Sequence, residues 1–394
     1  MSRATEVIKK TAWRAAAARI AVALAISVPI TLIGAQAADA AWALQNPPVP
    51  AGALGSDLAD VSCTTGSSCV AIGGSELSGS VFVAFADAWN GSSWTLENIP
   101  NASNSNLSGV SCPFVGICIA VGDVLKNGKL VPLVEKSNGS VWTAKSLPAP
   151  SGAASSYLLS DYCVSGQKCT AVGIYRTAGG DQFTFAETLN GSTWTMHSTP
   201  DPSGATNNQL NKVYCTSPAS CIAVGYYLSP SYTLLAESWN GTNWSIMTTP
   251  EPAGGTDGLF EGVACRNASA CFAVGTYSSG TKLLGLSEFW NGASWTPQPT
   301  APLTTAKAAG LAGVSCTTFG PCTAVGYERK NGHNLTLAEH WNGTSWKFQS
   351  TVIPPGAANS SMSAVSCRSN VDCTAVGFWV DGSGTDLVLA EQNT

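Results

Sequence analysis

Short apolar runs separated by turn-forming residues recur along the chain from about residue 42 onward. In one stretch they lie around Val314–Cys316, Cys322–Gly326 and Leu337–Trp341, and a fourth begins at Trp346. Runs this short, bounded by Gly, Asn and Pro, are typical of β-strands. Asn-Gly pairs readily adopt the positive φ angles of tight hairpin turns. They follow the third run at 90–91, 138–139, 190–191, 240–241, 291–292 and 342–343. The pattern predicts antiparallel strands joined by short turns.

The four runs belong to a unit that is repeated seven times. Each copy contains a C-x5-C pair, and successive pairs begin 49 to 52 residues apart. Self-similarity at this period, with four strands in each unit, is typical of β-propellers. We therefore predict an all-β, seven-bladed β-propeller with four antiparallel strands per blade. It forms a single domain over 41–394, with copies starting near residues 60, 109, 160, 212, 262, 313 and 364.

The two ends of the repeat complement each other. The last copy has no fourth run. Trp42–Pro47 resembles a fourth run, but it stands before the first copy and no first three runs precede it. Trp42 lies 21 residues before Cys63, and five other copies have the same spacing between this tryptophan and the next cysteine. We predict that the N-terminal strand of the mature chain pairs in the last blade, which closes the ring and leaves no unpaired edge.

The first 40 residues have a different character. Five basic residues and one acid lie within residues 1–19, no charge occurs over 20–37, and small residues follow at 37–41. This order is typical of a secretory signal peptide. An uncleaved membrane anchor is the alternative, because the uncharged stretch is just long enough to span a bilayer. We predict a signal peptide over 1–40 and a secreted mature protein, extracellular or in the cell envelope, without a membrane partner.

The composition restricts the compartment and the partners that the protein can have. Fourteen cysteines, an even number, favour an oxidising compartment. Only 11% of the residues are charged and the formal net charge is −5, so the chain lacks the basic surface that neutralises phosphates. We expect a monomeric protein with no nucleic-acid partner.

Each C-x5-C pair is interpreted as a disulfide between the first two strands of its copy, because opposed side chains there come close enough to be bridged. Metal or redox chemistry is the alternative. A zinc site needs four ligands, whereas each copy offers two cysteines, and His197, His333 and His340 match no repeated position. We expect no metal and no cofactor. The predicted disulfides are Cys63–Cys69, Cys112–Cys118, Cys163–Cys169, Cys215–Cys221, Cys265–Cys271, Cys316–Cys322 and Cys367–Cys373.

The motifs V-S-C, C-x-A-V-G and L-A-E-x-W-N-G-T-S-W, taken in this order, resemble the repeat of secreted bacterial β-propeller proteins over essentially the whole mature length. The repeat is also distantly similar to Asp-box and Kelch propeller repeats. It departs from the first because Asn240 and Gly241 are adjacent, where an Asp-box has Asp and Gly two residues apart. It departs from the second because the Gly-Gly doublet is missing. The resemblance implies the propeller fold and secretion, and it implies no activity.

Two further residue types recur in each copy. An acid lies three residues before each Asn-Gly pair or its equivalent, and we interpret it as a hydrogen-bond acceptor for a neighbouring turn or indole, with calcium ligation as the alternative. A tryptophan begins the fourth strand, where packing between blades is favoured over a platform for carbohydrate. The acids are Asp87, Glu135, Glu187, Glu237, Glu288, Glu339 and Glu391.

Function is expected where the copies differ. The loops between the second and third strands vary most, and several carry aromatic residues of the kind that binding surfaces use. We predict a non-catalytic binding module that holds a glycan or a protein through this loop face. The candidate binding residues are Tyr175, Tyr226, Tyr227, Tyr277, Tyr327, Arg329 and Trp379.

Two alternatives remain open from the sequence. Asp161 replaces the valine found two residues before the first cysteine in the other copies, and Glu261 lies at the start of the same strand in a later copy. Acids at the mouth of a propeller channel suit a polysaccharide hydrolase or lyase, so Asp161 and Glu261 are weak catalytic candidates. A purely structural protein of the cell envelope is the second alternative.

Overall fold

The structure is a computed structural model that describes residues 42–100, 103–303, 306–318, 320–369 and 371–393. The predicted signal peptide, 1–40, lies outside the described residues. Among the residues that are described, no helix is long and apolar enough to cross a membrane.

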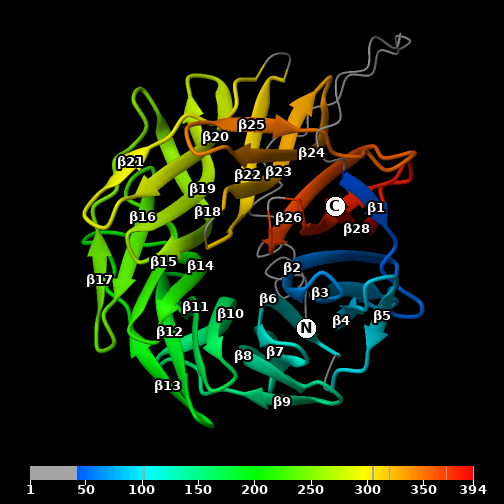
Figure 1. The fold of residues 1–394 in the computed structure, drawn as a ribbon. Coiled ribbons are helices and arrows are strands. Elements are labelled where there is room, and N and C mark those ends of the chain that lie inside the picture. Colours follow the sequence, from blue (N-terminus) through cyan, green and yellow to red (C-terminus); the bar gives the residue numbers. More distant parts are fainter. Residues whose placement is uncertain (1–41, 101–102, 304–305, 319, 370, 394) are drawn as a thin grey trace. The chain divides into compact units, whose positions relative to one another are not determined.

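Strands fill the described chain and form seven four-stranded antiparallel sheets, the blades (Figure 1). Blade 1 holds β2 (Gly55–Thr65), β3 (Ser68–Leu77), β4 (Val81–Trp89) and β5 (Trp94–Glu97). Blade 2 holds β6 (Ser105–Phe114), β7 (Ile117–Lys126), β8 (Lys129–Asn138) and β9 (Trp142–Ser146). Blade 3 holds β10 (Ala153–Ser165), β11 (Lys168–Thr177), β12 (Gln182–Asn190) and β13 (Thr193–Ser198).

The next blades repeat this order. Blade 4 holds β14 (Asn208–Ser217), β15 (Ser220–Leu228), β16 (Tyr232–Trp239) and β17 (Trp244–Met247). Blade 5 holds β18 (Thr256–Asn267), β19 (Ala270–Ser279), β20 (Lys282–Trp290) and β21 (Trp295–Pro297). Blade 6 holds β22 (Ala308–Cys316), β23 (Cys322–Lys330), β24 (His333–Trp341) and β25 (Trp346–Gln349). Blade 7 holds β26 (Asn359–Cys367), β27 (Cys373–Val380), β28 (Asp386–Asn393) and β1 (Trp42–Gln45).

Blade 7 confirms the predicted closure of the ring. β1 pairs antiparallel with β28, and Trp42 lies opposite Asn393 (Figure 1). Trp42 is only 2% exposed, so this strand contributes a core residue as well as backbone pairing. The first strand of each blade lies at the centre of the ring, and the fourth lies at its outside.

The innermost strands explain the glycine of the A-V-G motif. In every blade the register between the first two strands shifts by one residue, as between Leu210 and Lys212 in blade 4. The bulge brings the first strand against the glycine of the second. A Cβ added to Gly225 would overlap the carbonyl oxygen of Gln209, and the equivalent glycine of every other blade has the same restriction. The motif therefore reflects close backbone approach beside a β-bulge.

The cysteine pairs are disulfides in all seven blades, which confirms that prediction. Their Cα atoms are 3.9–4.1 Å apart across the first hairpin. The serine of the V-S-C motif has a separate role, because its hydroxyl accepts the backbone N–H of the first cysteine of the next blade. Ser62 accepts from Cys112 at 2.9 Å. Ser111, Ser315 and Ser366 make the same bond to their neighbours.

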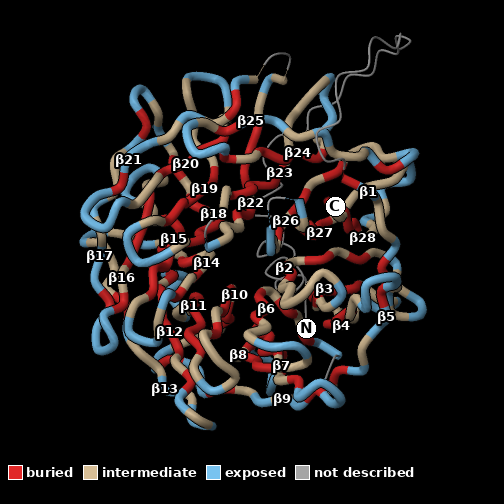
Figure 2. Tube along the Cα trace, in the orientation of Figure 1, coloured by how far each residue is buried: buried red, intermediate tan, exposed pale blue. Residues whose placement is uncertain are grey.

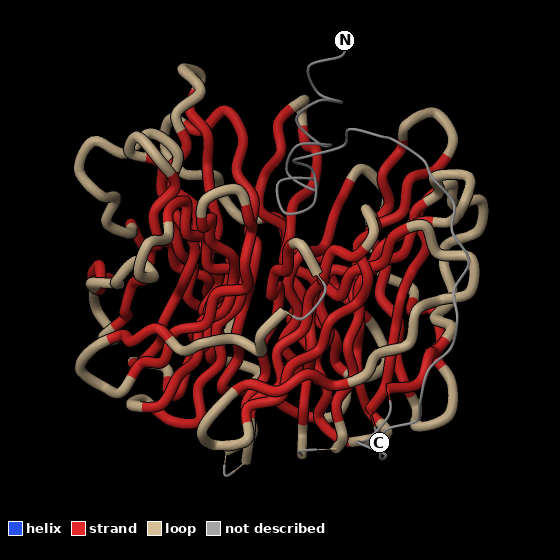
Figure 3. The backbone as a smooth tube through the Cα atoms, turned by 90° about the horizontal axis from the view of Figure 1, so that it is seen from above, coloured by secondary structure: helices blue, strands red, loops and turns tan. Residues whose placement is uncertain are grey.

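The core lies between neighbouring blades rather than in one central mass (Figure 2). Six of the fourth-strand tryptophans, those other than Trp194, are at most 8% exposed. They pack between blades, as predicted. The loops gather at the two ends of the strands (Figure 3). One end carries the disulfide hairpins and Asn-Gly turns, and we call it the hairpin face. The other carries the loops between the second and third strands, and we call it the loop face.

Candidate functional site

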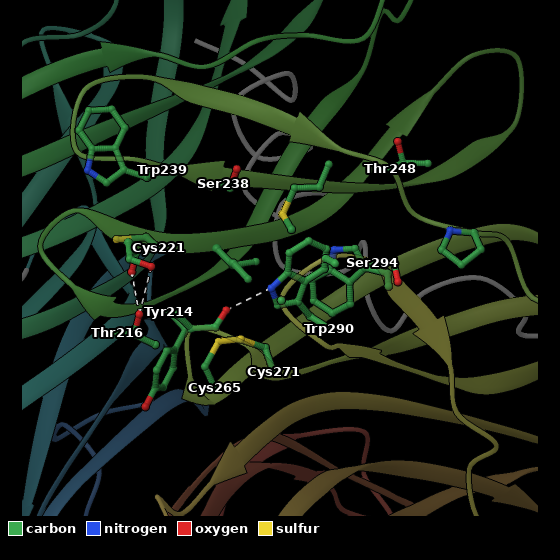
Figure 4. Close-up of a pocket in the computed structure, with 18 residues that line it drawn as sticks. Tyr214, Thr216, Cys221, Ser238, Trp239, Thr248, Cys265, Cys271, Trp290 and Ser294 are labelled. Atoms are coloured by element: carbon green, nitrogen blue, oxygen red, sulfur yellow. Dashed lines mark hydrogen bonds between the residues drawn. A yellow bond between two sulfur atoms is a disulfide. The ribbon is translucent and has the colours of Figure 1, made fainter.

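A cleft of about 580 Å³ lies between blades 4 and 5 on the hairpin face (Figure 4). Its wall in blade 4 comes from β14, β15, β16 and the end of β17, and its wall in blade 5 comes from the disulfide hairpin and the turn between β20 and β21. Its aromatic and apolar lining comprises Tyr214, Ile222, Trp239, Met247, Trp290 and Trp295, together with Cys221 of blade 4 and the Cys265–Cys271 disulfide of blade 5. Hydroxyl groups of Thr216, Ser220, Ser238, Thr248 and Ser294 line the rest.

Two side chains of blade 4 that flank the repeated motifs line the cleft. Ile222 follows the second cysteine of blade 4, and Ser238 precedes the tryptophan of β16. At the corresponding positions blade 5 has Phe272 and Phe289, whose rings lie 5.0 Å apart. Phe272 also packs 5.0 Å from Trp341 of blade 6, so bulky rings occupy the corresponding space there.

The interface between blades 3 and 4 is filled by a different side chain. His197 of blade 3 packs edge-on against Trp239 of blade 4, with ring centroids 4.8 Å apart. The residue of blade 4 that corresponds to His197 is Met247, which lines the cleft. His197 fills one interface and the rings of Phe272 and Phe289 fill another, whereas blade 4 has Met247, Ile222 and Ser238 at the corresponding positions.

Trp290 is the half-exposed aromatic residue with a fixed orientation in the cleft. Its indole N–H donates to the carbonyl oxygen of Ala268, at 3.2 Å, in the hairpin of its own blade. Its ring lies 5.6 Å from that of Trp295, which is buried beneath it. Trp89 of blade 1 and Trp239 of blade 4 make the same indole bond, to Gly66 and Pro218, so Trp290 holds a repeated scaffold position.

None of the described residues that line the cleft carries a charged side chain. The hydroxyl of Thr216 donates within blade 4, to the backbone carbonyl and the hydroxyl of Ser220 at 3.3 and 3.1 Å. The carboxyl of Glu288, two residues before Trp290, is fully buried. Burial, together with the negative charge of Glu251, raises its pKa to about 8. The group is therefore mostly protonated at neutral pH, and the site as a whole is uncharged.

The recurring acids are all buried, with at most 2% of each residue exposed. Burial raises their pKa values to between about 7 and about 9. Two of them accept backbone N–H groups from the segment that links consecutive blades: Glu339 from Ala301 at 2.9 Å, and Glu391 from Val352 at 3.1 Å. Both carboxyl oxygens of Asp87, Glu135, Glu237 and Glu288 have no hydrogen-bond partner among the described residues. Over the same residues, no three potential metal ligands converge.

The structure corrects the placement of the aromatic candidates of the loop face. They were expected in loops, but they lie within the second strands: Tyr175 in β11, Tyr226 and Tyr227 in β15, Tyr277 in β19, Tyr327 and Arg329 in β23, and Trp379 in β27. The second strands extend further than expected, because these residues still pair with the first strand, as Tyr226 does with Gln209. Tyr226 is 9% exposed and donates its hydroxyl to Gln209, and the others are half-buried.

The two catalytic candidates belong to different hydrogen-bonded groups. Asp161 is 3% exposed, and its neighbours are Asp60 and Lys212, which form a 2.6 Å ion pair between blades 1 and 4. Burial raises the pKa of Asp161 well above its usual value. Glu261 instead accepts from the side-chain amide of Asn211 at 3.1 Å, and burial raises its pKa to about 7. The arrangement does not present the two acids as a pair.

Sequence reasoning did not find the cleft. Its residues lie on the hairpin face, where the repeated motifs are most regular, and attention to variable loops led to the opposite end. The positions next to the motifs carry no distinctive signal, because Val70 and Ala88 of blade 1 are no larger than Ile222 and Ser238.

No protein-family model matches the chain, and no curated protein does. Among solved structures, Sqt1 from Chaetomium thermophilum is 11% identical, with 87% of this chain and 89% of that chain covered and a TM-score of 0.49. The Aleuria aurantia lectin, described as a six-bladed β-propeller with a novel fucose recognition mode, is 12% identical, with 78% and 98% covered and a TM-score of 0.43. Trypanosoma rangeli sialidase is 11% identical, with 88% and 56% covered and a TM-score of 0.44. The description of the fold and the cleft therefore rests on the strand pairing and contacts of this chain itself.

Proposed function

We propose that this protein is a non-catalytic glycan-binding module and that the cleft between blades 4 and 5 is its binding site. The observation that carries the proposal is a cavity that combines the fixed ring of Trp290 with a set of serine and threonine hydroxyls. Sugars present the matching chemistry, since their C–H faces pack on aromatic rings while their hydroxyl groups exchange hydrogen bonds. The cavity volume falls within the range of roughly 300–1,000 Å³ that is typical of small-ligand sites.

The proposed setting is outside the cytoplasm. Seven disulfides suit an oxidising environment, because cytosolic reductants keep most thiols reduced. We place a signal peptide at 1–40 and a single propeller domain at 41–394, and the exported protein acts as a monomer at the cell surface or beyond it.

The test fills the cleft with a side chain that the fold already uses. Ser238→Phe copies Phe289 of the next blade, and Ile222→Phe copies Phe272. Wild type and both variants are applied to a glycan array, and hits are measured by calorimetry. We expect the variants to melt cooperatively, keep their disulfides and lose binding to the wild-type hits.

The loop face provides the competing location. Tyr227→Ala and Trp379→Ala remove half-buried aromatic residues from two blades at that end. We expect both to bind like wild type. Full binding by Ser238→Phe, combined with loss of binding in the loop-face variants, would move the site to the opposite face and refute the proposal for the cleft.

A further inference from the structure

The chemical make-up of the cleft restricts its ligand further. Eighteen residues line it, and none of them is Asp, Glu, Lys, Arg or His. A ligand carrying a carboxylate, sulfate or phosphate would lose its hydration there without gaining an opposite charge, which is costly in a partly enclosed site. Glu288, two residues before Trp290, is a buried acid and adds nothing that attracts an anion.

The aromatic residues also argue against a cationic ligand. Quaternary ammonium groups are held by several ring faces that surround one point. Here Trp239 and Trp295 are 5% and 3% exposed, so their faces are already covered. The ring of Tyr214 is half-buried, with its centroid 4.1 Å from that of Tyr162. Trp290 is left as a single platform, which suits a flat apolar face better than a sphere of charge.

Residues that carry hydroxyl groups complete the site, and they come from both blades. Ser238 and Thr248 come from blade 4, and Ser294 comes from the turn of blade 5 next to Trp290 (Figure 4). A hydroxyl both donates and accepts, so it matches the hydroxyls of a sugar whichever way they point. Charged groups would instead select a ligand by the sign of its charge.

We infer that the ligand is an uncharged oligosaccharide, one sugar ring of which lies with its apolar face on Trp290 while its hydroxyls meet Ser238, Thr248 and Ser294. The inference rests on the proposed glycan-binding function and names the class of glycan. Because no charge takes part, binding is insensitive to salt, and anionic glycans are excluded.

The experiment compares four probes by calorimetry and tryptophan fluorescence. Two are neutral, a chito-oligosaccharide and a cello-oligosaccharide; the others are an oligogalacturonate and choline. We expect binding of a neutral probe that changes by less than about twofold between 0.05 and 0.5 M NaCl, since screening acts only on charges. Trp290→Ala should weaken it by about tenfold or more through loss of the ring contact.

Trp89→Ala is the matched control, because Trp89 has the same position, the same indole bond and the same neighbouring tryptophan in blade 1. Trp89→Ala should destabilise the protein about as much as Trp290→Ala does, and it should keep the wild-type affinity for the neutral probe. Equal loss of affinity in both variants would overturn the platform role of Trp290. Binding of oligogalacturonate or choline that Ser238→Phe abolishes would overturn the inference while leaving the cleft as the site. Binding of any probe that Ser238→Phe leaves intact would instead refute the proposed function.

Discussion

Replacing Glu237 with glutamine should remove one pH-dependent contribution to the stability of the propeller. Glu237 is fully buried, and neither carboxyl oxygen has a hydrogen-bond partner among the described residues. Burial raises its pKa from 4.5 to about 9, and the negative charge of Asp201 adds to the effect. Glutamine has nearly the same shape and cannot ionise, so Glu237→Gln separates the cost of charge from the cost of lost packing.

The direction of the pH dependence follows from which state, folded or unfolded, binds the proton of Glu237 more tightly. The folded state holds the proton of Glu237 up to about pH 9, whereas the unfolded chain releases it near 4.5. Below the lower value both states are protonated, so the group makes no pH-dependent contribution. Between the two values unfolding releases a proton, so stability falls as pH rises, by about 1.4 kcal/mol per pH unit. From pH 6 to pH 8 this single group should cost the wild type about 3 kcal/mol relative to Glu237→Gln.

The assay is thermal unfolding of both proteins at pH 6 and pH 8 under non-reducing conditions. For a chain of this length 1 kcal/mol corresponds to between about 1 and 2 °C, so the gap between variant and wild type should widen by roughly 4 °C. Asp181→Asn, at an exposed carboxylate, is the control and should show the same difference at both pH values. A gap for Glu237→Gln that stays constant between pH 6 and pH 8 would show that the buried carboxyl is ionised or partnered in the folded protein.

Three further predictions concern the scaffold. Ser62→Ala removes the hydrogen bond to the N–H of Cys112 and should destabilise the protein by about 1 kcal/mol in urea unfolding, while an unchanged midpoint would mean that the bond contributes nothing. Lys212→Met leaves the carboxylate of Asp60 buried without its ammonium partner; we expect a loss of about 3 kcal/mol, most of it restored by adding Asp60→Asn, and a double variant as unstable as the single one would contradict this. Gly225→Ala places a methyl group against the backbone of the first strand, so we expect little or no folded protein by circular dichroism, and a wild-type melting curve would refute the packing argument.

The sequence predicted the repeated features of the fold because each is fixed locally. The C-x5-C spacing determines which cysteines face each other, and the Asn-Gly turns determine which strands form hairpins. Closure of the ring was also predictable, because the spacing from Trp42 to Cys63 identified β1 as a fourth strand. Tyr226 was placed in a loop because the end of a strand depends on pairing with its partner, and the partner's length is not visible in the sequence of one strand.

The cleft depends on a different kind of information. Ile222 and Ser238 are unremarkable in sequence, and each is small only in comparison with Phe272 and Phe289. Whether a small residue leaves a cavity depends on which other side chains extend into the interface, as His197 does against Trp239. Such a site is a property of two blades together, so inspection of a single repeat does not reveal it.

The scaffold itself changes at the same interface. At four of the seven contacts between blades, the V-S-C serine accepts the backbone N–H of the next first cysteine. Blades 3, 4 and 5 have Tyr162, Tyr214 and Ala264 in place of the serine, and none of these residues can supply that short hydroxyl. Tyr214 instead lines the cleft, with its ring beside that of Tyr162. The cavity therefore lies within the group of blades that has given up a regular interblade bond. The missing serine and the cleft therefore belong to the same interblade contact, since Tyr214 both replaces the serine and lines the cavity.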